Sequence, residues 1–417
     1  MRLVATATAA MLVMGTAQAE TQVRVHYAIP TIWADVQQML ADAFMEAHPD
    51  IEIVIDGPAE SYAEGVQRLL RERVAGTLPD VAYVGLNRWR ILEDRGLTQP
   101  LDPFITDEAA FEAAGYTGAL RSLGQYEGVQ HALATSASTL VMYVNPDLVE
   151  RAGGSMEDFP TTFDGVIDLA GKIDVLGDTI DGIWIGRHDW RFQSLLGAHG
   201  GRPMTADESD ITFDQAPGVA AAELYARFVT EGGMKTYGQD QARQAFPAGT
   251  IGIMMESSSL MTRFTEAAGD GFDVTVKALP VVAEDPSTVY FPTGGSAIVL
   301  LSEDPAVQQA AWDYITFVTG PEGAKIVVEN TGYAPTNALV LEDDSYLGDF
   351  YANNPNAFVA HAQVAAHAGP WYAYPGAEGV AVTDLIAAAL VEITEGAAPQ
   401  TTITDLAETV RGELGMK

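Results

Sequence analysis

Short apolar runs alternate with amphipathic segments in the early part of the chain, and this alternation limits the fold more than any other feature. Apolar runs and apolar–polar alternation predict strands over 23–27, 51–55 and 81–84. Apolar residues at helical spacing predict helices over 35–47 and 62–75 between them. Strands that alternate with helices form right-handed crossovers, so we expect a parallel sheet covered on both faces. Ligands on such sheets bind beyond the carboxyl ends of the strands.

The later part of the chain continues this pattern and predicts a second α/β section that begins near Leu140. Apolar runs predict strands over 140–144 and 251–255, and two further runs, 274–282 and 297–301, flank the segment Pro292–Gly295. The expected helices cover 163–173, 218–230, 305–319, 380–395 and 403–414.

The N-terminus has the features of a cleavable export signal. Arg2 precedes an apolar stretch over 3–13, and Ala17-Gln18-Ala19 provides a small-x-small cleavage site. We therefore expect residues 1–19 to be a signal peptide. The chain has no cysteine, which excludes disulfides, thiol nucleophiles, cysteine metal sites and the lipid anchor of bacterial lipoproteins. These features predict a periplasmic protein that is not lipid-anchored.

Charge and motif content exclude several classes of function. Lys and Arg number 22 against 57 Asp and Glu, so the net charge is −35, and we expect neither nucleic acid nor an anionic membrane as partner. The seven histidines show no tight metal-ligand spacing, and neither a zinc-protease motif nor a serine nucleophile elbow occurs. We expect a protein without metal, cofactor or catalytic residues.

Aromatic residues stand in irregular positions where a ligand could reach them. Trp33 follows the first predicted strand, Trp190 lies in a polar stretch, and Trp371 and Tyr374 lie in a loop bounded by proline and glycine. Aromatic faces suit sugar rings, because the C–H faces of a pyranose are apolar while its rim of hydroxyls forms hydrogen bonds. Each of these residues also fits a simpler role in the core or as a loop anchor.

Eight short segments follow one another in an order and spacing that match one known family. They are Ala47–Ile51, Leu78–Val81, Tyr143–Asp147, Phe159–Phe163, Gly200-Gly201, Pro292–Gly295, Gly320–Glu322 and Thr331–Pro335. Through them nearly the whole chain after residue 19 resembles the extracellular solute-binding proteins of ABC importers, in the carbohydrate group called family 1. Within that group the chain is most similar to the branch that binds glycerol-3-phosphate and glycerophosphodiesters.

The resemblance implies an α/β, two-lobed periplasmic-binding-protein fold of type II. Each lobe would be a mainly parallel sheet flanked by helices, with the ligand cleft between the lobes. The expected lobes are 20–138 with 293–334, and 139–292 with 335–417. Such a protein is a monomer that binds a small solute, closes about a hinge and delivers the solute to an ABC permease in the inner membrane, without breaking a bond.

The resemblance, together with the aromatic positions, also implies a set of ligand-binding residues. Gly294 and Gly295 would let the backbone approach the ligand or flex at the hinge, although a tight strand entry explains them as well. The full set is Trp33, Tyr62, Glu64, Ser136, Ser138, Trp190, Ser257, Gly294, Gly295, Tyr333, Trp371 and Tyr374.

The chain departs from the branch at the residue that grips phosphate. The branch has an arginine in a late Gly-Leu-Arg-Leu-Gly stretch, whereas Tyr374–Gly379 contains no arginine or lysine and gains Glu378. We therefore expect a neutral sugar or polyol. A phosphoester is the alternative, and it would require Arg187 or Arg191 as the substitute cation. A polyamine receptor and a secreted polysaccharide-degrading enzyme are the remaining alternatives.

Overall fold

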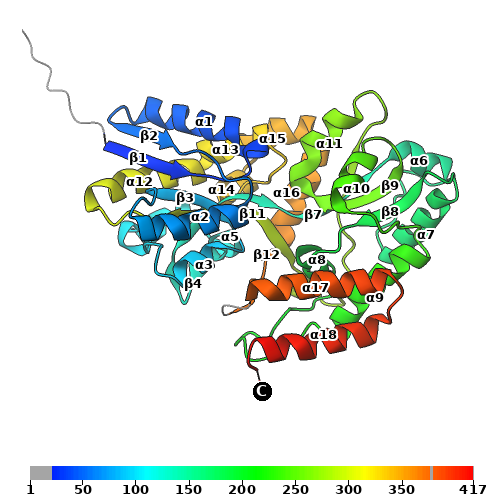
Figure 1. Cartoon of the computed structure of the whole chain (residues 1–417). Coiled ribbons are helices and arrows are strands. Elements are labelled where there is room, and N and C mark those ends of the chain that lie inside the picture. Colours follow the sequence, from blue (N-terminus) through cyan, green and yellow to red (C-terminus); the bar gives the residue numbers. More distant parts are fainter. Residues whose placement is uncertain (1–20, 376–378, 417) are drawn as a thin grey trace, which may run out of the picture.

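A computed structural model describes residues 21–375 and 379–416 of the chain; the predicted signal peptide and Glu378 lie outside the described residues. Two sheets lie side by side, each covered by helices (Figure 1). The two-lobed α/β fold predicted from the sequence is confirmed. No helix in the described ranges is long and apolar enough to cross a membrane.

The first sheet has the strand order β12-β11-β3-β1-β2. The strand β6 also belongs to it and pairs with Gly294–Val299 of β11, beyond the residues that pair with β12. The strands β1 and β2 are parallel, as are β1 and β3, whereas β11 runs antiparallel to both β3 and β6. The strand bounds are β1 Thr21–His26, β2 Ile51–Ile55, β3 Val81–Gly85, β6 Ala132–Ser138, β11 Phe291–Leu300 and β12 Ala368–Pro370.

The second sheet has the order β10-β7-β9-β8. Only β8 and β9 pair in parallel, while β7 runs antiparallel to both β9 and β10. The expectation of mainly parallel strands therefore does not hold for this sheet, because β7 runs antiparallel to both of its neighbours. The bounds are β7 Leu140–Val144, β8 Asp181–Ile185, β9 Ile251–Ser257 and β10 Thr275–Lys277; β4 Gln125–Tyr126 and β5 Val129–Gln130 form a separate hairpin.

The helices divide into three groups. Those near the first sheet are α1 Pro30–Ala47, α2 Tyr62–Ala75, α3 Trp89–Glu93, α4 Glu108–Ala113, α5 Gly118–Ser122, α12 Pro305–Thr319 and α13 Pro321–Asn330. Those near the second sheet are α6 Pro146–Arg151, α7 Phe163–Asp174, α8 Asp189–Ala198, α9 Ala216–Thr230, α10 Gln239–Ala245, α11 Met261–Ala268, α17 Gly379–Thr394 and α18 Pro399–Glu413. The remaining group is α14 Ala338–Glu342, α15 Asp344–Asn353 and α16 Pro355–His367.

Separate hydrophobic cores underlie the two sheets. One large core joins the second sheet to α7, α8 and α9, and it includes side chains of α17 and α18, which pack on α9 (Figure 1). Two other cores lie on the two sides of the first sheet. The helices α14 and α15 pack against α13 through a small cluster around Val328 and Tyr351. The lobe boundaries predicted from the sequence remain a prediction.

The strand β11 runs from one core to another, because Phe291 packs in the core of the second sheet whereas Ile298 and Leu300 pack in a core of the first sheet. Its first residues, Phe291–Thr293, pair with β12, and its later residues pair with β6 and β3. The segment Pro292–Gly295 is therefore the start of a continuous strand, whereas the sequence placed it between two apolar runs. Gly295 has φ 118°, and a Cβ there would lie 2.1 Å from the carbonyl oxygen of Ser136, so this position requires glycine.

Candidate functional site

A cavity of 750 Å³ lies where the carboxyl end of β9, the loop after β1 and the start of β11 meet. Seven of the residues predicted from the sequence line it: Ser138, Trp190, Ser257, Gly294, Gly295, Tyr333 and Trp371. They come from both halves of the chain, since Ser138 ends β6 of the first sheet and Ser257 ends β9 of the second. The structure thus gathers more than half of the predicted set around one cavity.

The other five predicted residues lie outside the lining of this cavity. Trp33 is buried on α1 and stacks on Tyr333 at 5.6 Å between ring centroids, and its indole N–H donates to the hydroxyl of Tyr62. Trp33 and Tyr62 therefore contact one another next to Tyr333, and of these three only Tyr333 lines the cavity. Ser136 is buried, and its hydroxyl accepts a hydrogen bond from the backbone N–H of Ser296.

Glu64 and Tyr374 have local roles away from the cavity. The Ser61 hydroxyl caps α2 by accepting the backbone N–H of Glu64, and the carboxylate of Glu64 accepts the backbone N–H of Glu60, the residue before the cap. Tyr374 is 5% exposed and packs in the core of the second half. Together with Arg88 it lines a separate, smaller cavity.

Trp190 lies at the N-terminus of α8, where the chain leaves β8. The imidazole of His188 caps this helix by accepting the backbone N–H of Trp190 at 3.1 Å. The indole N–H of Trp190 donates to the carbonyl oxygen of Pro292 at 2.8 Å, so the ring is fixed against the start of β11. Its exposed fraction is only 5%, so one edge of the ring contributes to the cavity while most of it packs in the core.

A buried carboxylate holds the second indole in place. The indole N–H of Trp371 donates to Asp189 at 3.0 Å, and the side-chain amide of Gln193 donates to both oxygens of the same carboxylate. Gln193 also accepts the backbone N–H of Tyr372 and donates to its carbonyl oxygen. Burial raises the pKa of Asp189 to about 6, and the hydrogen bonds from Trp371 and Gln193 oppose this rise. Asp189 and Gln193 therefore fasten the Trp371 loop to α8.

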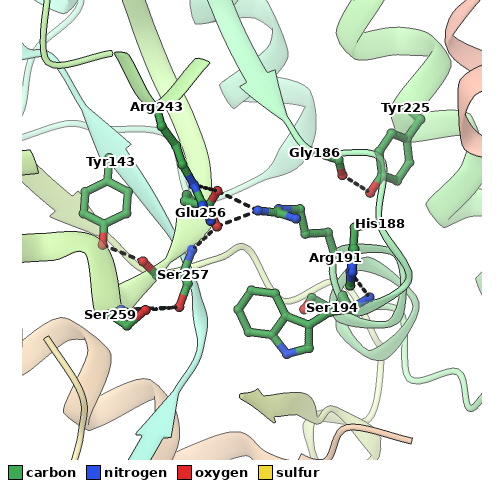
Figure 2. Close-up of polar contacts among 11 residues, drawn as sticks. Tyr143, Gly186, His188, Arg191, Ser194, Tyr225, Arg243, Glu256, Ser257 and Ser259 are labelled. Carbon is green, nitrogen blue, oxygen red and sulfur yellow. Dashed lines mark hydrogen bonds and ion pairs between the residues drawn. The ribbon is translucent and has the colours of Figure 1, made fainter. Parts of the chain in front are cut away.

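The polar floor of the cavity is an ion-pair cluster. Both oxygens of Glu256, at the end of β9, lie 2.6 Å from Nη2 of Arg191 on α8, and Arg243 on α10 approaches at 3.2 Å (Figure 2). The Arg191 and Glu256 side chains are 4% and 1% exposed. Burial alone would raise the pKa of Glu256, but the guanidinium groups of Arg191 and Arg243 outweigh it and hold the pKa below its usual value.

Hydroxyl groups surround this cluster. The Ser257 hydroxyl lies 2.9 Å from that of Ser259, and the phenol of Tyr143 donates to the carbonyl oxygen of Ser257 at 2.7 Å (Figure 2). Burial and the nearby Arg191 lower the pKa of His188 to about 4, so its ring is neutral at pH 7. The cavity therefore offers neutral donors and acceptors beside a cluster in which two guanidinium groups share one carboxylate.

The two arginines that could replace the missing phosphate-binding arginine are both engaged. Arg187 donates to the backbone carbonyl oxygens of Thr236 and Tyr237 and does not line the cavity. Arg191 lines the cavity, but its guanidinium binds Glu256. Neither residue presents a free cation to a ligand.

Several lining residues were not among those predicted. Arg243, Gln239 and Arg263 lie on α10 and α11, whose faces the sequence pattern did not orient. Glu256 differs from these residues, because the resemblance already implied that the segment Glu256–Ser258 lines the cleft, and a carboxylate after the apolar run 251–255 requires a partner. Ile29 lines the cavity with φ 59°, a backbone conformation that is rare for a β-branched residue and that no pattern in the sequence indicated.

No group of three or more metal-ligating side chains occurs within the described ranges.

Comparison with known proteins identifies the family. Residues 39–359 match the model of the bacterial extracellular solute-binding proteins. The chain belongs to this family. The sequence-based prediction of a solute-binding component of an ABC import system is thereby confirmed. Relatives include the sn-glycerol-3-phosphate-binding periplasmic protein UgpB of Pectobacterium atrosepticum, which is 23% identical over 87% of this chain and 84% of its own length.

Solved structures share the fold over almost the whole chain. UgpB from Mycobacterium tuberculosis in complex with glycerophosphocholine has a TM-score of 0.82 at 21% identity, covering 94% of this chain and 98% of that one. The cyclic α-maltosyl-1,6-maltose binding protein of Arthrobacter globiformis has a TM-score of 0.78 at 22% identity, covering 94% and 99%. The predicted resemblance to the glycerol-3-phosphate-binding branch is confirmed by these matches.

Proposed function

We propose that this solute-binding protein works in the periplasm, where it captures a neutral sugar or polyol in the cavity by hinge closure. The loaded protein then docks as a monomer on an ABC permease of the inner membrane. The solute leaves unchanged, since the protein supplies contacts and no reaction. Ligand stabilises the closed state only through contacts made to both lobes at once.

The observation that carries this proposal is the pairing of Arg191 with Glu256 at the cavity floor. The carboxylate of Glu256 occupies the guanidinium of Arg191 and so weakens its attraction for a phosphate. The same pair suits hydroxyl groups, because the carboxylate accepts and the guanidinium donates. The indoles of Trp190 and Trp371 border the cavity beside this pair, so a sugar ring could stack while its hydroxyls reach the charges.

The proposed hinge is the point where three segments of the chain meet. β6 and β11 pair up to Ser138 and Gly294, and Ala137 forms a bridge with Ala334. We retain crossings near Ser138, Pro292 and Tyr333, with the lobe boundaries predicted from the sequence. Three hydrogen-bonded crossings would restrict the motion to opening and closing of the cleft.

A glycerol phosphoester is the second candidate. Arg243 and Arg263 also line the cavity, and Arg263 forms no ion pair within residues 21–375 and 379–416. The curated relative from Pectobacterium is named for sn-glycerol-3-phosphate, and the mycobacterial structure contains glycerophosphocholine. In this alternative Arg263 would take the place of the missing late arginine.

Thermal shift and calorimetry with one ligand panel separate these candidates. The panel contains hexoses, disaccharides, polyols, glycerol-3-phosphate, glycerophosphocholine and spermidine, because a ligand that binds the folded state raises the unfolding midpoint. We expect a sugar or polyol to bind, and Arg263→Gln to leave its affinity unchanged. A response limited to the phosphoesters, lost in Arg263→Gln, would replace the sugar proposal with the second candidate. Release of smaller products from any ligand would contradict the binding-only role.

A further inference from the structure

An ion pair joins the two predicted lobes outside the lining of the ligand cavity. Arg90 on α3 lies 3.3 Å from the carboxylate of Glu208, which lies in the loop between α8 and α9. The helix α3 packs in a core of the first lobe through Trp89 and Leu92, whereas the loop is anchored in the core of the second lobe through Met204. Neither Arg90 nor Glu208 lines the ligand cavity. The pair therefore acts between the lobes and away from the space proposed for the solute.

The loop that carries Glu208 is fastened to the second lobe. Met204 and Ile211 close it with an antiparallel bridge. Arg411 on α18 donates to the carboxylate of Asp210 at 2.7 Å and to the carbonyl oxygen of Ile211 at 2.9 Å. Glu208 has φ 57°, a left-handed conformation that a residue other than glycine seldom adopts. These contacts fix the position of the Glu208 carboxylate in advance, so the ion pair forms without the cost of ordering a free loop.

Both charged groups are partly buried and have further contacts. The side chains of Arg90 and Glu208 are 25% and 33% exposed. The guanidinium of Arg90 lies 4.1 Å from the ring centroid of Tyr126, and the hydroxyl of Tyr372 donates to Glu208 at 3.1 Å. Water and salt therefore screen this pair less than they screen a fully exposed one.

Opening of the cleft would separate the two charges. Neither residue belongs to the segments proposed as the hinge, near Ser138, Pro292 and Tyr333. Rotation of the lobes about that hinge changes the distance between Arg90 and Glu208. Because an ion pair requires nitrogen and oxygen within about 4 Å, a small rotation breaks it. The pair thus belongs to the arrangement of the lobes seen in the structure and not to a more open one.

We propose that Arg90 and Glu208 form an ionic latch, which stabilises the closed arrangement of the lobes and so raises the affinity for every solute that binds by closure. The apparent affinity depends on the population of the closed state, so a contact that favours closure strengthens binding without touching the ligand. The latch therefore strengthens the binding of all such solutes by the same factor, whereas a residue that lines the cavity changes the preference among them. This inference rests on the hinge closure of the proposed function and adds a contact that sets the affinity.

A double-mutant cycle on ligand affinity tests the latch. Glu208→Gln removes the charge and keeps an oxygen that can accept the hydroxyl of Tyr372. We expect this variant and Arg90→Gln each to bind the sugar found in the panel roughly fivefold more weakly, and the double variant to bind no more weakly than either. The control Arg227→Gln/Asp164→Asn removes an ion pair within the second lobe and should leave the affinity unchanged.

The same cycle shows whether the effect depends on the solute. We expect each latch variant to weaken every sugar or polyol that binds by one common factor. Unchanged affinities, additive losses in the double variant, or losses that differ between solutes would each overturn the latch.

Distances between the lobes, measured without ligand, test the latch independently of the proposed function. The chain has no cysteine, so spin labels can be placed at Val74→Cys on α2 and Val175→Cys at the end of α7, positions that are 90% and 80% exposed. We expect the distribution of distances to broaden when Glu208→Gln is added, and to stay unchanged when Arg227→Gln/Asp164→Asn is added. An unchanged distribution in Glu208→Gln would contradict the latch. If no sugar or polyol binds, the proposed function fails, while the label distances still decide whether this ion pair holds the lobes together.

Discussion

A substitution of Trp371 should affect mainly ligand binding, whereas a substitution of Trp190 should also lower the stability of the fold. Trp371 is only half-buried and is held by Asp189, whereas Trp190 is 5% exposed and packs in the core. We expect Trp371→Ala to weaken binding of the sugar found in the panel at least tenfold, and to cost about 1 kcal/mol of stability. Trp190→Ala should cost about 3 kcal/mol as well as binding. Calorimetry and urea unfolding measure the two effects.

The conservative variant Trp371→Phe is the control for this prediction. It keeps an aromatic face but loses the N–H that donates to Asp189. We expect binding to be partly retained, since stacking survives while the orientation of the ring is less fixed. Full binding by Trp371→Ala would remove this residue from the proposed site.

A buried histidine outside the cleft predicts the pH dependence of stability. Burial and the nearby Arg68 lower the pKa of His26 to about 4, against attraction from Glu72 and Asp56. Above pH 6.5 the ring is neutral in both the folded and unfolded states. As the pH falls from 6.5 to 4 the unfolded state gains a proton that the folded state does not, so stability falls by up to about 3 kcal/mol. Urea unfolding at several pH values should show that His26→Leu flattens this decrease, and an unchanged slope would contradict the assignment.

At the scale of the element, β11 contains a glycine whose backbone conformation and close contact disfavour any side chain. A Cβ at Gly295 would combine φ 118° with a clash at 2.1 Å against Ser136. We expect Gly295→Ala to cost about 2 kcal/mol or more, because β6 must shift away from β11. Gly128→Ala is the matched control, since Gly128 has φ 82° and open space around it, and should cost about 1 kcal/mol. Equal losses in thermal unfolding would show that the clash is relieved without cost.

The sequence predicted helices and strands well where apolar residues recur at one regular spacing, either that of a helix or that of a strand. The strands β1, β2 and β3 and the helices α17 and α18 lie close to their predicted ranges, because each has a clear apolar pattern. The apolar pattern alone did not join Pro292–Gly295 to the run 297–301, because proline and two glycines usually mark a turn. These residues remain in the strand because β12 and β6 pair with the two halves of the segment.

The sequence predicted the site less completely than the fold. The order of the family motifs correctly placed Ser138, Trp190, Gly294 and Tyr333 at the cavity, because matching motifs indicate where each backbone segment lies in the shared fold. It could not decide that Trp33 points into the core, because an indole after a strand fits either role. The network of Asp189 with Trp371 joins residues 182 positions apart, and no local pattern reports such a pairing.

At the scale of the whole molecule, the net charge of −35 predicts a dependence on salt. Like charges repel across a compact surface, and ions screen them over a distance of about 10 Å at 0.1 M salt. We expect the thermal midpoint to rise by several degrees between about 20 mM and about 500 mM NaCl. Sucrose at matched osmolality is the control. An equal rise in sucrose would attribute the effect to solvent exclusion rather than to screening.

The indoles of Trp190 and Trp371 lie 6.1 Å apart between centroids, one fixed to β11 and the other to α8. Emission from tryptophan depends on the polarity and quenching groups around the ring, and these two rings border the cavity proposed to hold the solute. We therefore expect the intrinsic tryptophan fluorescence of the unlabelled protein to change when the cavity is occupied, and stopped-flow mixing can record this change. The rates of solute association and dissociation can then be obtained from this fluorescence alone.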